Sequence, residues 1–192
     1  ASVSAKQYVA GVVGYANGDT EIDRCQNNAD ITASSSMVGG IVSSVNGVNC
    51  KMTNCFNSGT ISGTGSIGTL VATGNAKSII ENNLNIGKAV CTGTMTTIGN
   101  VRAVTSAATG IKNNYVIEHY TNGKDYETVV TADQLASGEI AVLLGEAWGQ
   151  NIGKDKTPVI DGKKVYVNED SYTNNNPAYA DIINFEDVDL NR

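Results

Sequence analysis

The sequence repeats itself with a period of about thirty residues, and this limits the available folds more than any other feature. Successive copies of a short apolar motif start 29, 29 and 31 residues apart, at Val9, Val38, Ile67 and Ile98. At a nearly constant offset, each copy carries a small polar or thiol residue: Cys25, Cys55, Asn83 and Asn114. Because these two separate positions recur with nearly the same spacing, each copy is expected to form one equivalent structural unit.

Each period contains three short runs of β-forming residues separated by Gly, Asn or Ser. Such runs cannot bury themselves alone, but stacked coils would pair each run with its equivalent about 4.8 Å away. A composition of 6% aromatic residues, 21 Gly and 2 Pro also suits short strands joined by turns. We therefore predict a mainly β chain, a right-handed parallel β-solenoid of about four coils of 29–31 residues with a small C-terminal α/β cap. The alternative is an antiparallel sandwich.

The repeat also predicts which residues form ladders along the coil. An inward aliphatic ladder is expected at Val12, Ile41, Leu70 and Val101. The residues at the second set of repeated positions, Cys25, Cys55, Asn83 and Asn114, are expected to form a structural ladder at one corner. Asn27, Asn57 and Asn85 also recur, and their amides would bond to one another and to the turn backbone at a bend. Glycines are expected at sharp corners, which need a positive φ or a missing Cβ.

Two of the copies resemble the GLUG repeat of bacterial surface proteins. The resemblance is carried by Gly11-Val12-Val13-Gly14-Tyr15 and Gly39-Gly40-Ile41-Val42, with the Cys segments that follow each of them, and extends over residues 9–117. It implies a spacer or binding stalk of an adhesin-like, secreted or cell-wall-attached protein, acting as a monomer within a longer chain. The third and fourth copies depart from the pattern, with Thr69, Ala72, Asn100 and Arg102 at expected Gly or aliphatic positions. This decay is expected where a terminal coil is being capped.

The periodicity ends near Tyr120, so we divide the chain into a solenoid at residues 1–121, an α/β capping segment at 122–170 and a tail at 171–192. Thr131 and Gln134 have the spacing of a capping box, and an apolar stripe of Leu135, Ile140, Leu143 and Leu144 predicts short helices over about 132–146. The segment from Trp148 to Tyr166 resembles the one that closes GLUG regions, with Trp148 as a plug over the open end of the solenoid. The tail is either an acidic linker or a docked extension.

The charge of the chain argues against nucleic acid as a partner. The formal net charge is −6, and six of the 19 acids follow Asn168 with Arg192 as the only base there. The preceding residues hold 13 acids and 12 bases and show no basic patch. A membrane span is not expected either, since no run of about eighteen apolar residues occurs.

No catalytic, cofactor or metal site is predicted. Cys25, Cys50, Cys55 and Cys91 match no zinc spacing, and His119 is the single histidine. Cys25 and Cys55, one coil apart, are within disulfide range but are interpreted as stacked thiols. The acids Asp19, Glu21 and Asp23 alternate on one strand, and we interpret them as a solvated rim, with weak Ca²⁺ binding as the alternative.

Exposed aromatic residues are the candidate interaction site, namely Tyr8, Tyr15, Phe56 and Tyr115, although rings at coil corners also serve packing. The predicted function is a structural or adhesive stalk without catalysis of its own, with a host glycan or protein as the ligand class. The alternative is a carbohydrate-binding or carbohydrate-active β-helix of the lyase or glycosidase kind, which would need clustered carboxylates or converging rings.

Overall fold

The chain folds into two compact units, which are described separately. The structure, a computed structural model, describes residues 3, 5–34, 37–75, 77–94, 97–103, 110–120, 126–167 and 182–184. The first unit is Ala1–Val129 and the second is Val130–Arg192.

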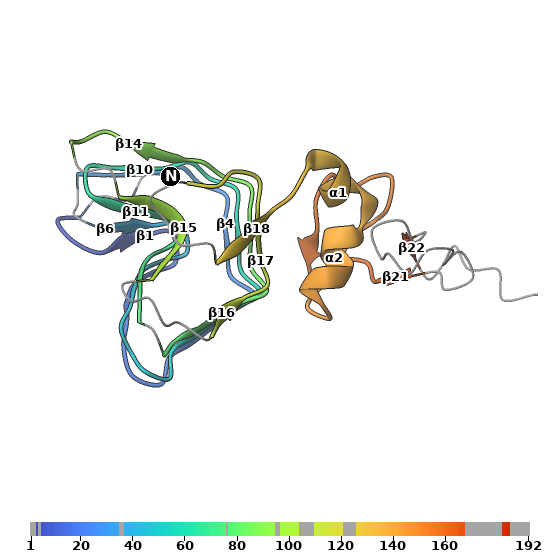
Figure 1. Ribbon diagram of the computed structural model, residues 1–192, viewed down its shortest axis with the longest axis horizontal. Helices are drawn as coiled ribbons and strands as arrows, with labels where there is room; N and C mark the ends of the chain where they lie inside the picture. Colours follow the sequence, from blue (N-terminus) through green and yellow to red (C-terminus); the bar gives the residue numbers. More distant parts are fainter. Residues whose placement is uncertain are drawn as a thin grey trace, which may run out of the picture. The chain divides into compact units, whose positions relative to one another are not determined.

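The first unit is a β-solenoid whose strands recur coil by coil (Figure 1). The first coil contains β1 (Val9–Ala10), β2 (Val13–Ala16), β3 (Glu21–Asp23), β4 (Gln26–Asn27) and β5 (Ile31–Ala33). The second contains β6 (Met37–Gly39), β7 (Val42–Val45), β8 (Lys51–Thr53), β9 (Phe56–Asn57) and β10 (Ile61–Gly63). The third contains β11 (Ser66–Gly74), β12 (Ile79–Glu81), β13 (Leu84–Asn85) and β14 (Ala89–Cys91). The fourth contains β15 (Ile98–Ala103), β16 (Ile111–Lys112) and β17 (Asn114–Val116), and β18 (Glu127–Val129) follows.

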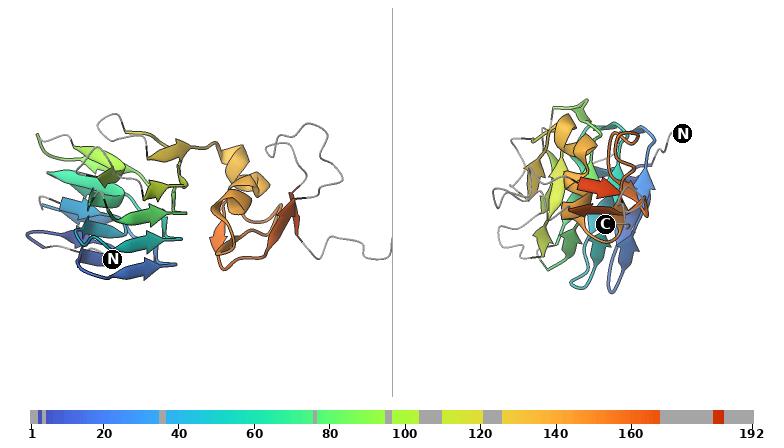
Figure 2. Two further views of the ribbon diagram at one scale, coloured as in Figure 1. Left: turned by 60° about the horizontal axis from the view of Figure 1, so that its bottom comes forward. Right: turned by 90° about the vertical axis from the view of Figure 1, so that its right-hand side faces the viewer.

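Every pairing between coils is parallel, which confirms the predicted solenoid. The sheets run β3-β8-β12-β16, β4-β9-β13-β17-β18 and β5-β10-β14, and a fourth sheet joins β1, β2, β6, β7, β11 and β15. Figure 2 shows these coils stacked on one another. The solenoid has about three turns, where about four coils were predicted. The described part of the fourth coil adds no strand to β14. The right-handed sense of the coil stays a prediction.

The solenoid extends further along the chain than residue 121. Strand β18 pairs in parallel with β17, with Asn114 opposite Glu127 and Val116 opposite Val129. Since β18 adds one more layer to that sheet, the division between the two units falls after Val129.

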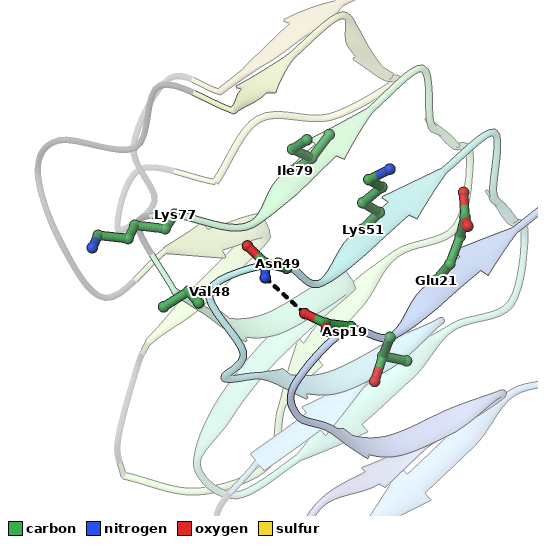
Figure 3. A pocket seen from close by; sticks show the side chains of 8 residues that line it. Asp19, Glu21, Val48, Asn49, Lys51, Lys77 and Ile79 are labelled. Carbon is green, nitrogen blue, oxygen red and sulfur yellow. Dashed lines mark hydrogen bonds between the residues drawn. The ribbon is translucent and has the colours of Figure 1, made fainter.

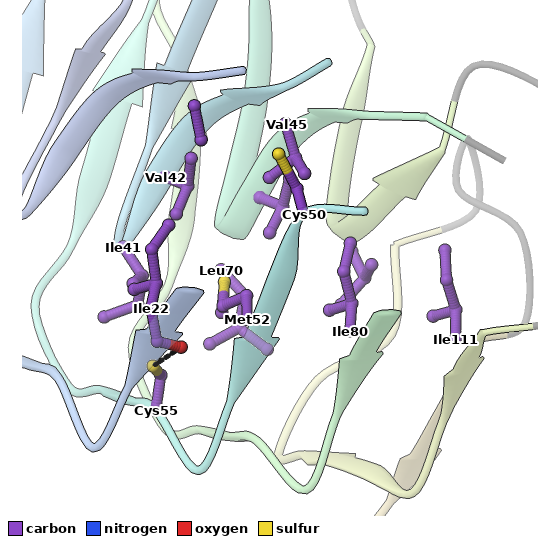
Figure 4. Packing of buried hydrophobic residues seen from close by; sticks show 13 residues of the cluster. Ile22, Ile41, Val42, Val45, Cys50, Met52, Cys55, Leu70, Ile80 and Ile111 are labelled. Atoms are coloured by element: carbon purple, nitrogen blue, oxygen red, sulfur yellow. Dashed lines mark hydrogen bonds between the residues drawn. The ribbon is translucent and has the colours of Figure 1, made fainter. Parts of the chain in front are cut away.

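The interior is filled by aliphatic ladders, as Figure 4 shows for Ile22, Met52, Ile80 and Ile111. Ile41, Leu70 and Val101 are fully buried, as predicted. Val12 is not, because it belongs to the first coil and is 41% exposed. The prediction that Val12 is an inward core residue is therefore wrong.

The fourth coil also shifts its register. Ile98 and Gly99 pair with Ile67 and Gly68, but Val101 pairs with Val71 across an irregularity. One residue of β15, Asn100, therefore faces two residues of β11. The predicted equivalence of Val101 with Leu70 is off by one position, because sequence spacing does not reveal a bulge.

The corners are built differently from the prediction. The residue before each member of the Cys/Asn column has a positive φ, and these residues are Arg24, Asn54, Asn82 and Asn113, none of them glycine. Asn tolerates this conformation better than most residues. The repeated glycines serve close approach instead: a Cβ on Gly40 would lie 1.9 Å from the carbonyl oxygen of Thr69.

The second unit starts with two short helices, α1 (Ala132–Ser137) and α2 (Glu139–Leu144). The predicted capping box is confirmed: the Gln134 backbone N–H donates to the Thr131 hydroxyl, and the Gln134 side chain accepts from the Thr131 N–H. The helices meet at Gly138, which has a φ of 89°. Of the predicted apolar stripe only Leu143 is exposed.

Two small antiparallel ladders complete the second unit. β19 (Trp148–Gly149) pairs with β20 (Val159–Ile160), and β21 (Val165–Val167) pairs with β22 (Ile182–Asn184). Residues 182–184 of the tail are thus docked, and the rest of the tail lies outside the described residues. Trp148 is buried, but its role as a plug stays a prediction. Within the described residues, no helix has the length and apolar character to cross a membrane.

Candidate functional site

A row of buried asparagine amides runs along the solenoid, and we call Asn27, Asn57, Asn85 and Asn100 the amide ladder. Asn27 Nδ2 donates to Asn57 Oδ1 at 2.8 Å, and Asn57 Nδ2 donates to Asn85 Oδ1 at 2.8 Å. Asn27, Asn57 and Asn85 also each donate to the carbonyl two residues on, for example from Asn57 to Gly59 at 3.0 Å. The predicted Asn column therefore satisfies buried polar groups inside the coil.

In the fourth coil the amide ladder continues from a different strand, because the position equivalent to Asn85 is not an asparagine. The residue paired with Asn85 there is Val116, which cannot accept a hydrogen bond. Asn85 Nδ2 instead donates to Asn100 Oδ1 at 3.1 Å, and Asn100 Nδ2 donates to Glu127 Oε1 at 3.1 Å. The Glu127 carboxylate is buried, and His119 Nδ1 lies 3.6 Å from the same oxygen. A carboxyl oxygen therefore closes the ladder.

The second predicted ladder occupies one equivalent corner in all four coils. The carbonyl oxygens of Cys25, Cys55 and Asn83 each accept from the N–H of the following coil. Asn83 Nδ2 donates to Asn114 Oδ1 at 2.9 Å, and the Cys55 N–H donates to Asn83 Oδ1 at 2.8 Å. All four cysteines are free thiols. Burial raises the pKa of the Cys55 thiol to about 12, so it is protonated and unreactive at neutral pH.

Tyr120 completes an otherwise unpaired strand edge. In the earlier coils the N–H groups of Ile31 and Ile61 donate to backbone carbonyls of the next coil. The corresponding N–H of Ala89 donates to the Tyr120 hydroxyl at 2.8 Å, so a side chain takes the place of the missing strand. Burial raises the pKa of Tyr120.

The four aromatic candidates separate into two pairs. Tyr8 and Tyr15 are 37% and 45% exposed, and their ring centroids lie 5.0 Å apart in an edge-to-face arrangement. Phe56 and Tyr115 are only 8% and 7% exposed and stand in register on either side of Leu84. The two tyrosines thus remain interaction candidates, whereas Phe56 and Tyr115 contribute to packing.

The chain brings the two tyrosines together by a close backbone approach. A Cβ on Gly14 would lie 2.6 Å from the carbonyl oxygen of Tyr8, so glycine lets the segment before β1 pass against β2. Tyr8 itself has a φ of 54°. The hydroxyl of Tyr15 accepts a hydrogen bond from Asn46 Nδ2 at 2.7 Å, which ties the ring to the turn after β7.

An open groove of about 510 Å³, the corner groove, lies over the turns that lead into β3, β8 and β12 (Figure 3). Its charged side chains are Asp19, Glu21, Lys51 and Lys77. Glu21 and Lys51 stand opposite each other in register on β3 and β8, yet no ion pair joins them. The groove thus presents two amines and two carboxylates to solvent.

The rest of the corner groove is both polar and aliphatic. Asn49 Nδ2 donates to Asp19 Oδ1 at 2.7 Å, which holds that carboxylate against the next coil. Thr20 adds a hydroxyl, and Val48 and Ile79 supply aliphatic surface. The lysines were not among the residues singled out from the sequence, because the segments that carry them become neighbours only when the coils stack.

The third predicted acid, Asp23, and the acid Glu81 of the next-but-one coil are each engaged within the protein. Asp23 Oδ1 accepts from the Thr53 hydroxyl and from Asn54 Nδ2, both at 2.7 Å. Glu81 pairs with Lys112 at 3.4 Å. In the part of the chain that the structure describes, no group of three or more His, Cys, Asp or Glu side chains could hold a metal ion.

Comparisons of the chain with protein-family models, with curated proteins and with solved structures gave no match.

Proposed function

We propose that the chain is a structural or adhesive repeat module, a stalk or spacer of a secreted or cell-surface bacterial protein without catalysis of its own. The observation that carries this proposal is the in-register stacking of equivalent strands, with Val9, Val38, Ile67 and Ile98 as one continuous column. Each added coil lengthens such a structure by a constant step and changes nothing else. A spacer needs this property.

Two further features support the proposal. The amide ladder and the aliphatic ladders link the first three coils in register, so neighbouring coils hold each other in place. The resemblance of residues 9–117 to GLUG repeats adds the cell-surface setting. The proposed ligand class for an adhesive role is a host glycan or protein.

The spacer role can be tested with a molecular ruler. Fluorophores placed at Lys6 in the first coil and Lys112 in the fourth would report their separation by energy transfer. Deleting residues 38–66 joins Met37 to Ile67, which already pairs with Val38 in register. The separation should shrink by about 4.8 Å on deletion and grow by about the same step when these residues are duplicated. An unchanged separation in folded variants would contradict the spacer role.

A carbohydrate-binding module is the second candidate, and the exposed pair of Tyr8 and Tyr15 favours it. Exposed tyrosine rings offer an apolar face together with a polar hydroxyl, which suits a sugar ring. A glycan array probed with the full chain should then show binding that the double substitution Tyr8→Ala and Tyr15→Ala removes. A matched double substitution of the exposed Val90 and Val129 should leave the binding pattern unchanged.

A further inference from the structure

The corner groove has the features of a ligand site. It follows the stacking direction, because the turn before β3, the turn before β8 and the turn before β12 come from three successive coils. It is open, so a chain-like ligand could lie along it without entering the core (Figure 3). Its lining comes from side chains of turns and of the first residues of β3, β8 and β12, which lie outside the ladders.

The two amines of the groove are available to a ligand. Lys112 pairs with Glu81, and Lys164 with Glu146, but neither Lys51 nor Lys77 forms an ion pair with a described carboxylate. An amine that is not engaged within the protein can donate charge-assisted hydrogen bonds to an anionic group. The ligand should therefore carry negative charge.

The same groove holds carboxylates that would repel a purely anionic ligand. Asp19 is fixed by Asn49, and Glu21 stands beside Lys51. Carboxylates accept hydrogen bonds from hydroxyl groups, so a ligand with both an acid group and hydroxyls satisfies all four charged side chains. The exposed aliphatic side chain of Val48 suits the C–H face of such a ligand.

We propose that the corner groove binds an acidic saccharide, with Lys51 and Lys77 on its carboxylate groups, Asp19 and Glu21 on its hydroxyls, and Val48 under a sugar ring. This inference goes beyond the spacer role and does not depend on it. Tyr15 adjoins the site through Asn46, which lies in the same turn as Val48 and Asn49. The tyrosine pair is therefore placed to extend the contact along a longer saccharide.

The test is calorimetric titration of the full chain with tetragalacturonate, using its methyl ester as the neutral probe. Tetragalacturonate should bind the parent chain, and the double substitution Lys51→Gln and Lys77→Gln should weaken binding about tenfold or more. The matched double substitution Lys6→Gln and Lys88→Gln makes the same change in net charge on two other exposed lysines of the solenoid. Its affinity should equal that of the parent chain. An equal loss in both double variants, or no binding by the parent chain at millimolar concentration, would overturn the site.

Replacement of Glu21 distinguishes a saccharide ligand from an acidic peptide ligand. Removal of this carboxylate strengthens the binding of any ligand that is held by charge alone. It weakens a ligand whose hydroxyl donates to Glu21, so Glu21→Ala should lower the tetragalacturonate affinity about threefold to tenfold. Hexaglutamate is the comparison probe. A rise in tetragalacturonate affinity, or hexaglutamate binding as tightly as the sugar, would reject the saccharide. The energy-transfer ruler is unaffected by either result, so the spacer role is judged separately.

Discussion

The second and third coils use equivalent residues for equivalent contacts, whereas the fourth coil has different residues at several of these positions. Between the second and third coils the amide of Asn57 meets the amide of Asn85, and Ile61 N–H meets a backbone carbonyl. In the fourth coil Val116 stands where an asparagine is expected, and the Tyr120 hydroxyl takes the place of a strand. Within the described residues, the Asn85 amide and the Ala89 N–H of the third coil each have a new acceptor.

The comparison also shows where substitutions are tolerated. The choice of residue is tightly constrained in the middle coils, because each strand position there packs against the equivalent position of the coil before and the coil after. The fourth coil accepts Asn100, which pairs across a bulge and joins the ladder from another strand.

Gly40→Ala should be among the most damaging small substitutions in the solenoid. The added Cβ would lie 1.9 Å from the Thr69 carbonyl oxygen and 2.8 Å from the Asn57 amide, so two coils would have to separate. We expect a loss of about 3 kcal/mol in the free energy of unfolding, measured by urea denaturation. Gly63→Ala is the control, because its Cβ would meet the Val38 side chain at 3.3 Å. Equal losses would show that close approach at Gly40 is unimportant.

Asn57→Ala should break the amide ladder in its regular part. It removes the acceptor of Asn27 Nδ2 and the donor to Asn85 Oδ1, both in the buried interior. We expect a loss of about 2 kcal/mol in the free energy of unfolding, because buried partners are left without hydrogen bonds. Asn28→Ala, which truncates an exposed amide, should change the same quantity by less than about 0.5 kcal/mol. Similar losses from both variants would contradict a stabilising ladder.

Tyr120→Phe should destabilise the closing coil by about 1 kcal/mol, because the Ala89 N–H loses its acceptor. The effect should be local. Amide hydrogen exchange at Ala89 should speed up, while exchange at Ile61, whose N–H donates to the Lys88 carbonyl, should keep its rate. Unchanged exchange at Ala89 would show that the hydroxyl does not protect this edge.

Thiol labelling should distinguish the cysteines without altering stability. The Cys55 thiol, with its pKa raised to about 12 by burial, has almost no thiolate at pH 8. Iodoacetamide should therefore modify Cys55 at least about tenfold more slowly than the partly exposed Cys25 and Cys91, as followed by peptide mass spectrometry. Labelling of Cys55 as fast as Cys91 would mean that the corner opens readily.

The regular part of the molecule was predictable from the sequence, because equivalent residues recur in several copies of the repeat and so indicate the register. The pairings of Asn27 with Asn57 and of Asn57 with Asn85 follow directly from the period. The capping box at Thr131 was also predictable, since it is a local signal.

The irregular contacts could not be predicted in the same way. Asn100 lies 15 residues after its partner Asn85, about half a period, so no repeated spacing points to the pair. Its only signal was that it replaces an expected glycine. Glu127, which accepts from Asn100, lies beyond the repeat. The period did not indicate the exposure of Val12, and the corner groove arises from segments far apart in the chain.

The direction of its hydrogen bonds gives the amide ladder an electrical polarity. Every amide of this ladder donates toward the fourth coil, so their dipoles align head to tail, much as peptide dipoles do along a helix. The carboxylate of Glu127 sits at the positive end of this row. Aligned hydrogen bonds polarise one another, so a change at Asn27 would be felt as a change of potential at Glu127. Distant coils would thus be coupled electrostatically through their side chains as well as through their strands.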